Sequence, residues 1–168
     1  PNFEWWLSMV NEAVVARAKA GKAPIKSKMP STYGYAESVP ALCETRWGQD
    51  APYNNLCPTA TDGTRTLTGC AATSTAQVLF YHRAPEHGIG SHTIYYPANN
   101  MAGMKISVDF EKDNYDWNAM LETYDAGYST EEGDAVALIM RDLGVAFDME
   151  YGSDAEGGSG ALHENVAI

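Results

Sequence analysis

Long apolar segments and positive charges are both scarce in this sequence. It holds no run of about 18 apolar residues, so no membrane-spanning helix is predicted. Its 11 Lys and Arg residues face 22 Asp and Glu residues, which gives a formal net charge of −11 at pH 7. Non-specific binding to nucleic acid requires a basic surface, so this balance argues against a nucleic-acid partner. The composition fits a soluble secreted protein.

Cysteine is also rare, with three residues in the chain: Cys43, Cys57 and Cys70. Because the number is odd, at least one thiol stays free in any pairing within the chain. A Cys43–Cys57 disulfide is one alternative and two free thiols are the other, since geometry decides which forms. The spacings do not match a zinc site, and neither a metal nor a cofactor is expected.

A helix is predicted to begin at or just before Cys70 and to run to about His82. Thr68 is the expected N-cap, and Gly69 would allow a sharp turn into the helix. The small residues of the first two turns would let other backbone approach closely, and the apolar 78–80 segment is expected to cross a core. A thiol at a helix N-terminus faces unpaired N–H groups, which favour the nucleophilic thiolate. Cys70 is therefore a candidate nucleophile, although a buried structural cysteine would also fit its position.

A second segment upstream makes the nucleophile interpretation more specific. Residues 47–54 read Trp-Gly-Gln-Asp-Ala-Pro-Tyr-Asn, residues 68–73 read Thr-Gly-Cys-Ala-Ala-Thr, and Ala-Gln follows at 76–77. Together these motifs resemble the streptopain family of secreted bacterial cysteine proteases, a branch of the papain-like fold. The resemblance covers roughly residues 39–168, with a weaker match to the end of the family's propeptide before them.

The resemblance implies an α+β, papain-like fold, represented here mainly by its left, helical subdomain. It implies that Cys70 is the nucleophile of a cysteine endopeptidase with an apolar P2 preference. It also implies that Gln49 helps to form the oxyanion hole, where a preplaced amide stabilises the negative oxygen of the attacked carbonyl. A Gly/Ser-rich loop is expected to border the substrate cleft, through Gly152, Ser153, Gly158 and Ser159.

Three regions are predicted along the chain. Residues 1–21 are expected to be a helix that forms the C-terminal end of a propeptide, and residues 22–38 an activation linker. Residues 39–168 are expected to be the N-terminal half of the catalytic domain. The linker offers an apolar residue two places before Ser27, so self-processing of a zymogen is predicted after Lys26. Because the sequence opens on Pro1 rather than Met and shows no signal peptide, a processed or trimmed N-terminus is expected.

The catalytic histidine that this mechanism requires is not found at a matching position. His82 would lie about 18 Å from Cys70 along the helix, and His87 and His92 are expected in loops beyond that end. His163 matches no catalytic position of the family. The histidine is therefore expected in a C-terminal half that is missing or forms a second chain, which would be a partner besides protein substrates. Two alternatives are a non-catalytic binding or inhibitory protein built on a protease half, and a papain-fold acyltransferase.

The remaining elements are predicted from periodicity. Residues 93–96 and 104–110 are expected to pair as a hairpin, and residues 115–124 to form a helix. Another helix is expected to begin at Ser129 and to stop at Gly144, followed by an extended segment over 145–151.

Overall fold

The computed structural model describes Lys19 and residues 41–97 and 101–162. The chain divides into two units, Pro1–Pro40 and Ala41–Ile168, and the elements described below belong to the second. Apart from Lys19, the predicted N-terminal helix and the linker with Lys26 and Ser27 lie outside the described residues, as does His163.

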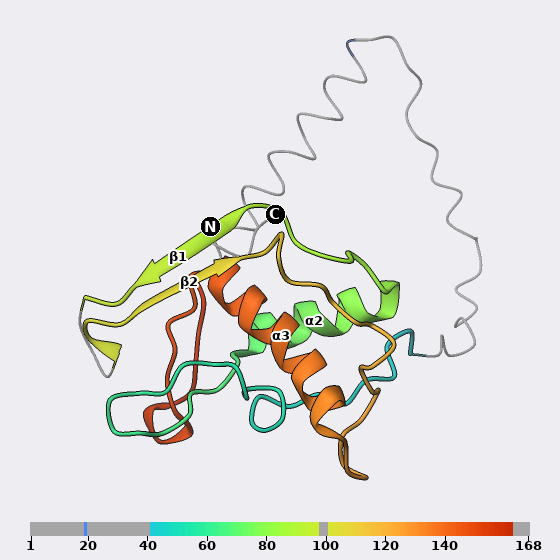
Figure 1. Ribbon diagram of the computed structural model, residues 1–168, viewed down its shortest axis with the longest axis horizontal. Helices are drawn as coiled ribbons and strands as arrows, with labels where there is room; N and C mark the ends of the chain where they lie inside the picture. The colour runs from blue at the N-terminus through green and yellow to red at the C-terminus, as the bar shows by residue number, and fades with distance from the viewer. Residues whose placement is uncertain (1–18, 20–40, 98–100, 163–168) are drawn as a thin grey trace. The chain divides into compact units, whose positions relative to one another are not determined.

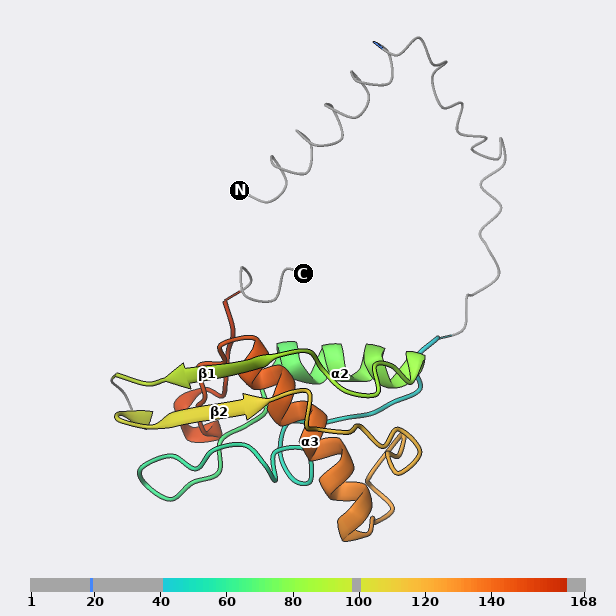
Figure 2. The ribbon, with the colours of Figure 1, turned by 45° about the horizontal axis from the view of Figure 1, so that its top comes forward.

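Two helices and one hairpin organise the described part of the second unit (Figure 1). Helix α3 packs across α2, and its C-terminal end lies beside the hairpin (Figure 2). In chain order the elements are α2 (Cys70–His82), β1 (Ser91–Tyr95), β2 (Lys105–Asp109), α3 (Thr130–Ala146) and the short 3₁₀ helix η2 (Asp154–Glu156).

Helix α2 begins at Cys70, as predicted, but its N-cap is Gly69 and not Thr68. The Thr68 hydroxyl lies 2.8 Å from the Thr73 hydroxyl instead, and no side chain caps the helix. Gly69 has φ 85° and ψ 140°, a conformation that side chains disfavour, and a Cβ there would lie 2.6 Å from the Met149 sulfur. A residue with a side chain therefore does not fit at the cap, and the turn before Cys70 is set by packing.

The core-facing side of α2 is narrower than predicted. Ala72, Ala76 and Phe80 are buried, so the small residues do allow close packing and Phe80 does enter the core. The side chain of Val78 is 50% exposed, contrary to the expectation that all of 78–80 crosses a core. A helix on the surface of a core buries one face, and Val78 lies on the other.

The predicted hairpin is confirmed. Strands β1 and β2 pair antiparallel, with Ile94 opposite Ile106, and residues 98–100 of the connection lie outside the described part. His92 lies within β1 and not in a loop. Its Nε2 is 2.6 Å from the Asp148 carboxylate, which ties the strand to the residue that follows the C-cap of α3.

Helix α3 begins after Ser129, close to the predicted start, with a capping box in which the Ser129 and Glu132 side chains each accept the backbone N–H of the other residue. Gly144 does not end the helix, which continues to Ala146. A Cβ at Gly144 would collide with the Tyr151 hydroxyl, so this glycine permits close approach of a ring rather than a helix stop. The predicted extended segment over 145–151 is correspondingly wrong at its first four residues, because 145–146 are helical and 147–148 form a turn.

No helix forms over residues 115–124, contrary to the prediction. The Asp116 carboxylate accepts the N–H groups of Asn118 and Ala119, which fixes a turn in place of a helix. Trp117 and Met120 of the segment are nevertheless buried. Long-range bonds such as Trp117 Nε1 to the Pro85 carbonyl, at 2.7 Å, hold the segment in this irregular path.

The buried side chains form two clusters. One lies between the C-terminal part of α2, the N-terminal part of α3 and the irregular 115–124 segment, and includes Trp47, Phe80, Trp117, Ile139 and Met140. The other lies between the start of α2, the hairpin and the end of α3, and includes Cys57, Ala72, Ile94, Val145 and Met149. The N-terminus of α2 is supported by this second cluster.

Candidate active site

A cleft of about 640 Å³ opens at the N-terminus of α2. Both residues predicted to act in catalysis, Cys70 and Gln49, line this cleft. The other lining residues come from the 47–50 segment, Leu67, helix α2 and η2: Trp47, Gly48, Asp50, Leu67, Thr73, Ser74, Gln77 and Asp154.

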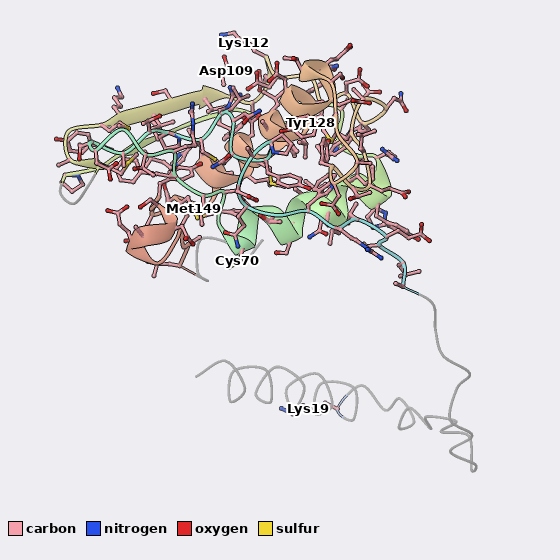
Figure 3. All side chains as sticks on the ribbon, turned by 90° about the horizontal axis from the view of Figure 1, so that it is seen from below. Lys19, Cys70, Asp109, Lys112, Tyr128 and Met149 are labelled. Atoms are coloured by element: carbon pink, nitrogen blue, oxygen red, sulfur yellow. The ribbon has the colours of Figure 1, made fainter. Side chains whose placement is uncertain are left out.

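Cys70 is the first residue of α2, and it is exposed and free (Figure 3). The N–H groups of a first helical turn have no partner within the helix, and Gly69 supplies no capping side chain. The first turn holds no acidic residue that would oppose a thiolate. Met149 packs against the turn at Gly69, and Figure 3 labels it near Cys70. An accessible thiol at an open helix N-terminus is one arrangement that suits a cysteine nucleophile.

Gln49 is half-buried, and its main chain is fixed by a bond from the Thr68 N–H to its carbonyl oxygen, at 3.1 Å. Within the described residues its side-chain amide has no hydrogen-bond partner, so the amide is free to donate into the cleft. The adjacent Trp47 is anchored by its Nε1, which donates to the Leu121 carbonyl at 2.8 Å, and by its ring contact with Phe80. The segment that carries Gln49 is therefore fixed by the Trp47 contacts in the core and by the main-chain bond from Thr68.

Buried polar bonds hold the 47–58 segment against the chain that leads to Cys70. The buried Asn54 amide donates to the Thr66 carbonyl at 2.9 Å, and the Thr66 N–H and hydroxyl both donate to the Pro58 carbonyl. With the bond between Thr68 and Gln49, these contacts place the 47–54 and 68–73 motifs of the sequence side by side.

The Gly/Ser-rich loop packs against the same chain segment. Of its residues, Asp154 lines the cleft, whereas Gly152 and Ser153 are buried and Gly158 and Ser159 are half-buried. The loop borders the cleft through Asp154, and none of the four residues predicted to contact substrate lines it.

The remaining thiols differ from Cys70. Cys57 is free and 1% exposed, and burial raises the pKa of its thiol to about 12. Cys43 is free and exposed, so the structure contains no Cys43–Cys57 disulfide. Cys43 does not line the cleft that Cys70 and Gln49 share.

No described histidine lines the cleft. His82 is the last residue of α2 and is exposed, and His87 Nδ1 lies 2.9 Å from the Gly88 carbonyl. His92 is engaged with Asp148. Within the described residues no cluster of His, Cys, Asp or Glu suits a metal ion, and no helix is long and apolar enough to cross a membrane.

Eight of the ten lining residues were not among the site residues predicted from the sequence, and three of them show which signals exist. Ser74 and Gln77 follow Cys70 by four and seven positions, the spacing of one helix face, so helical periodicity alone could have found them. Asp154 has no such signal, because its place depends on how the Gly/Ser-rich loop folds back.

Comparison with known proteins places this arrangement in a defined group. Residues 47–167 match the family model described as the peptidase C10 family. Streptopain from Streptococcus pyogenes is 31% identical over 179 residues, which cover 92% of this chain and 44% of streptopain. The thiol protease/hemagglutinin PrtT of Porphyromonas gingivalis is 28% identical over 96% of this chain and 19% of its own length. The chain thus spans less than half of these relatives.

Solved structures of interpain A from Prevotella intermedia are similar to the whole fold. A prointerpain A fragment matches 98% of this chain and 52% of its own, with a TM-score of 0.72 and 44% identity. The active wild-type interpain A cysteine protease matches 75% of this chain and 50% of its own, with a TM-score of 0.68 and 49% identity. These similarities confirm the predicted α+β, papain-like fold class.

Proposed function

The chain belongs to the peptidase C10 family, and we propose that it is the nucleophile-bearing half of a secreted bacterial cysteine endopeptidase. One observation carries the proposal: Cys70 stands exposed at the open N-terminus of α2, and Gln49 lines the same cleft with a free amide. Family membership alone supports a cysteine peptidase in general. The assignment of roles to these two residues rests on their geometry.

In the proposed reaction the Cys70 thiolate adds to the carbonyl carbon of the scissile peptide bond. The Gln49 amide and the Cys70 N–H donate to the carbonyl oxygen as it becomes negative. The C–N bond then breaks, and the amine leaves with a proton from a histidine outside this chain. Water cleaves the resulting thioester, which releases the carboxylic acid and restores the thiol.

The organisation of the precursor is part of the proposal. Residues 1–21 would be the end of a propeptide, and residues 22–38 a linker cut after Lys26 to leave Ser27 at the new N-terminus. Residues 39–168 would pair with a C-terminal half that supplies the histidine. An apolar P2 pocket and substrate contact by the 152–159 loop complete this proposal. The similarity to a prointerpain fragment supports the precursor organisation, and the place of Asp154 in the cleft supports contact by the loop.

The decisive test uses the full-length protein with casein as substrate and the Cys70→Ala variant. We expect hydrolysis and self-processing to be lost in this variant, because no other described thiol lines the cleft. Cys43→Ala is the matched control, since Cys43 is also an exposed free thiol, and it should keep full activity. Hydrolysis that survives Cys70→Ala would overturn the assignment of the nucleophile.

A second candidate function is a non-catalytic binding protein, which the absence of a described histidine from the cleft favours. Mass spectrometry of the purified natural protein separates the two functions. A second chain of about a hundred residues with one thiol-directed epoxide bound at Cys70 supports the peptidase. An unmodified Cys70 in a protein that lacks any further chain supports the binding protein.

A further inference from the structure

The Ser159 hydroxyl joins two chain segments that lie far apart in the sequence. Its oxygen is 2.7 Å from the Leu67 carbonyl oxygen, 3.1 Å from the Gly152 carbonyl oxygen and 3.0 Å from the Gly152 nitrogen. A hydroxyl has one proton to donate, and the shortest of these distances places it on the Leu67 carbonyl. The Gly152 N–H donates to the same hydroxyl, so its proton and one of its two acceptor positions are used within the protein.

Leu67 is held by this loop at both of its main-chain groups. Its N–H donates to the Gly152 carbonyl at 3.0 Å, while its carbonyl accepts the Ser159 hydroxyl. Glu150 and Gly160 exchange two main-chain bonds of 2.8 and 3.0 Å, which closes the base of the loop. The loop therefore forms a rigid support on which the chain three residues before Cys70 rests.

The same set of bonds also reaches Gln49, the predicted oxyanion residue. Thr68 follows Leu67 and donates its N–H to the Gln49 carbonyl at 3.1 Å. Ser159, Leu67, Thr68 and Gln49 thus form one continuous set of bonds beneath the start of α2. The Ser159 carbonyl also lies 3.3 Å from where a Cβ of Gly69 would be, so the turn into the helix has little room to shift.

We propose that Ser159 is a positioning residue for Cys70, and this inference rests on the proposed function of that thiol. The Ser159 hydroxyl fixes the Leu67 carbonyl, and through it the direction in which the chain enters α2. Without the hydroxyl, a half-buried carbonyl and the Gly152 N–H lose their partner and the turn can move. A misplacement of about 1 Å at a reacting group can cost about 100-fold in rate.

This role differs from the substrate contact predicted for Ser159 from the sequence. A side chain that binds substrate needs an unoccupied donor or acceptor facing the cleft, but the Ser159 proton is donated to Leu67 and Ser159 does not line the cleft. The two roles also have different kinetic signatures: loss of a contact made equally in ground and transition states raises KM, whereas misplacement of the nucleophile lowers kcat.

The test compares Ser159→Ala, Ser159→Thr and Ser159→Val in the full-length protein with a peptide substrate. Thr keeps the hydroxyl, and Val has the same shape without it. We expect Ser159→Ala and Ser159→Val to lower kcat by about 10- to 100-fold with KM within about 2-fold, and Ser159→Thr to keep most of kcat. Ser107→Ala is the matched control, because the Ser107 hydroxyl bonds that of Thr93 on the exposed hairpin, and it should leave kcat unchanged.

The rate of Cys70 alkylation by iodoacetamide, measured by peptide mapping in the same variants, does not depend on proteolysis. We expect slower alkylation of Cys70 in Ser159→Ala and Ser159→Val than in Ser159→Thr and the wild type, even if the full-length protein proves not to be a peptidase. Four results would overturn the proposal. Two concern the rates: kcat and alkylation unchanged in Ser159→Ala and Ser159→Val, or equal losses of kcat in Ser159→Thr and Ser159→Val. The other two are a rise in KM at constant kcat and failure of all three variants to fold.

Discussion

Replacement of Gly69 by alanine tests whether packing sets the turn before the nucleophile. Gly69 has φ 85° and ψ 140°, and an added Cβ would lie 2.6 Å from the Met149 sulfur and 2.7 Å from its terminal methyl. Met149 is completely buried in the cluster beneath the hairpin. The methyl group can therefore be accommodated only if a core side chain moves or the turn opens.

Two costs add in this variant. A residue with a side chain in a sparsely populated backbone region costs about 1–3 kcal/mol, and overpacking of a core costs about 1–3 kcal/mol more. The free energy of unfolding should fall by about 2–6 kcal/mol, a large part of the 5–15 kcal/mol or so that is typical of a folded domain. If the turn opens instead, the protein should keep more stability and lose activity, because Cys70 moves with it.

Gly63→Ala is the matched control for the assay, which is urea unfolding of the full-length protein followed by circular dichroism. Gly63 has φ 88°, close to that of Gly69, but no atom lies within 4 Å of its added Cβ. The free energy of unfolding of Gly63→Ala should therefore fall by the backbone cost alone, and the variant should keep its activity. Equal stability and equal activity of the two variants would refute the view that Met149 determines the turn.

Three further results are expected. Gln49→Ala should lower kcat by about 100- to 1000-fold in the casein assay, because one oxyanion donor is lost, and a change under 10-fold would argue for a structural role of this side chain. Peptide mapping after iodoacetamide treatment at neutral pH should find Cys57 unmodified until urea unfolds the protein, since burial raises its pKa to about 12. Hydrogen bonds from Ser129 lower the pKa of Glu132 below its ordinary value of 4.5, so the Glu132 carboxylate stabilises the fold above that pH and loses this effect as pH falls through the lowered pKa. Glu132→Gln should therefore lower the free energy of unfolding at neutral pH and have little effect at low pH. Urea titrations at pH 7 and pH 3 check the last point, and an equal loss at both would contradict it.

Local sequence signals predicted the elements that depend on neighbouring residues. The start of α3 follows from the Ser129–Glu132 capping box. The hairpin follows from alternation of apolar residues on β2. In each case the groups that determine the structure lie within a few residues of one another, so a sequence pattern contains them.

The failures involve bonds and contacts between distant segments, which act together with the local Asp116 turn in the 115–124 segment. Apolar spacing predicted a helix over 115–124, but Trp117 bonds to the Pro85 carbonyl, and the Tyr124 hydroxyl donates to the Glu132 carbonyl at 3.1 Å. Gly144 was expected to end α3, but it accommodates the Tyr151 ring. Tertiary context overrides local preference at these positions, and a single sequence does not reveal which distant group will arrive.

The candidate site divides in the same way, and this division has a consequence for variants. Cys70 and Gln49 could be predicted because their side chains belong to recognisable motifs. Their relative placement depends on bonds to main-chain carbonyls, from Thr68 to Gln49 and from Ser159 to Leu67. Main-chain groups are the same in every residue, so no motif marks them. Changes in the chemistry of the site should therefore arise at the motif residues, whereas changes in its geometry should arise at Gly69 and Ser159, which touch the turn and do not line the cleft.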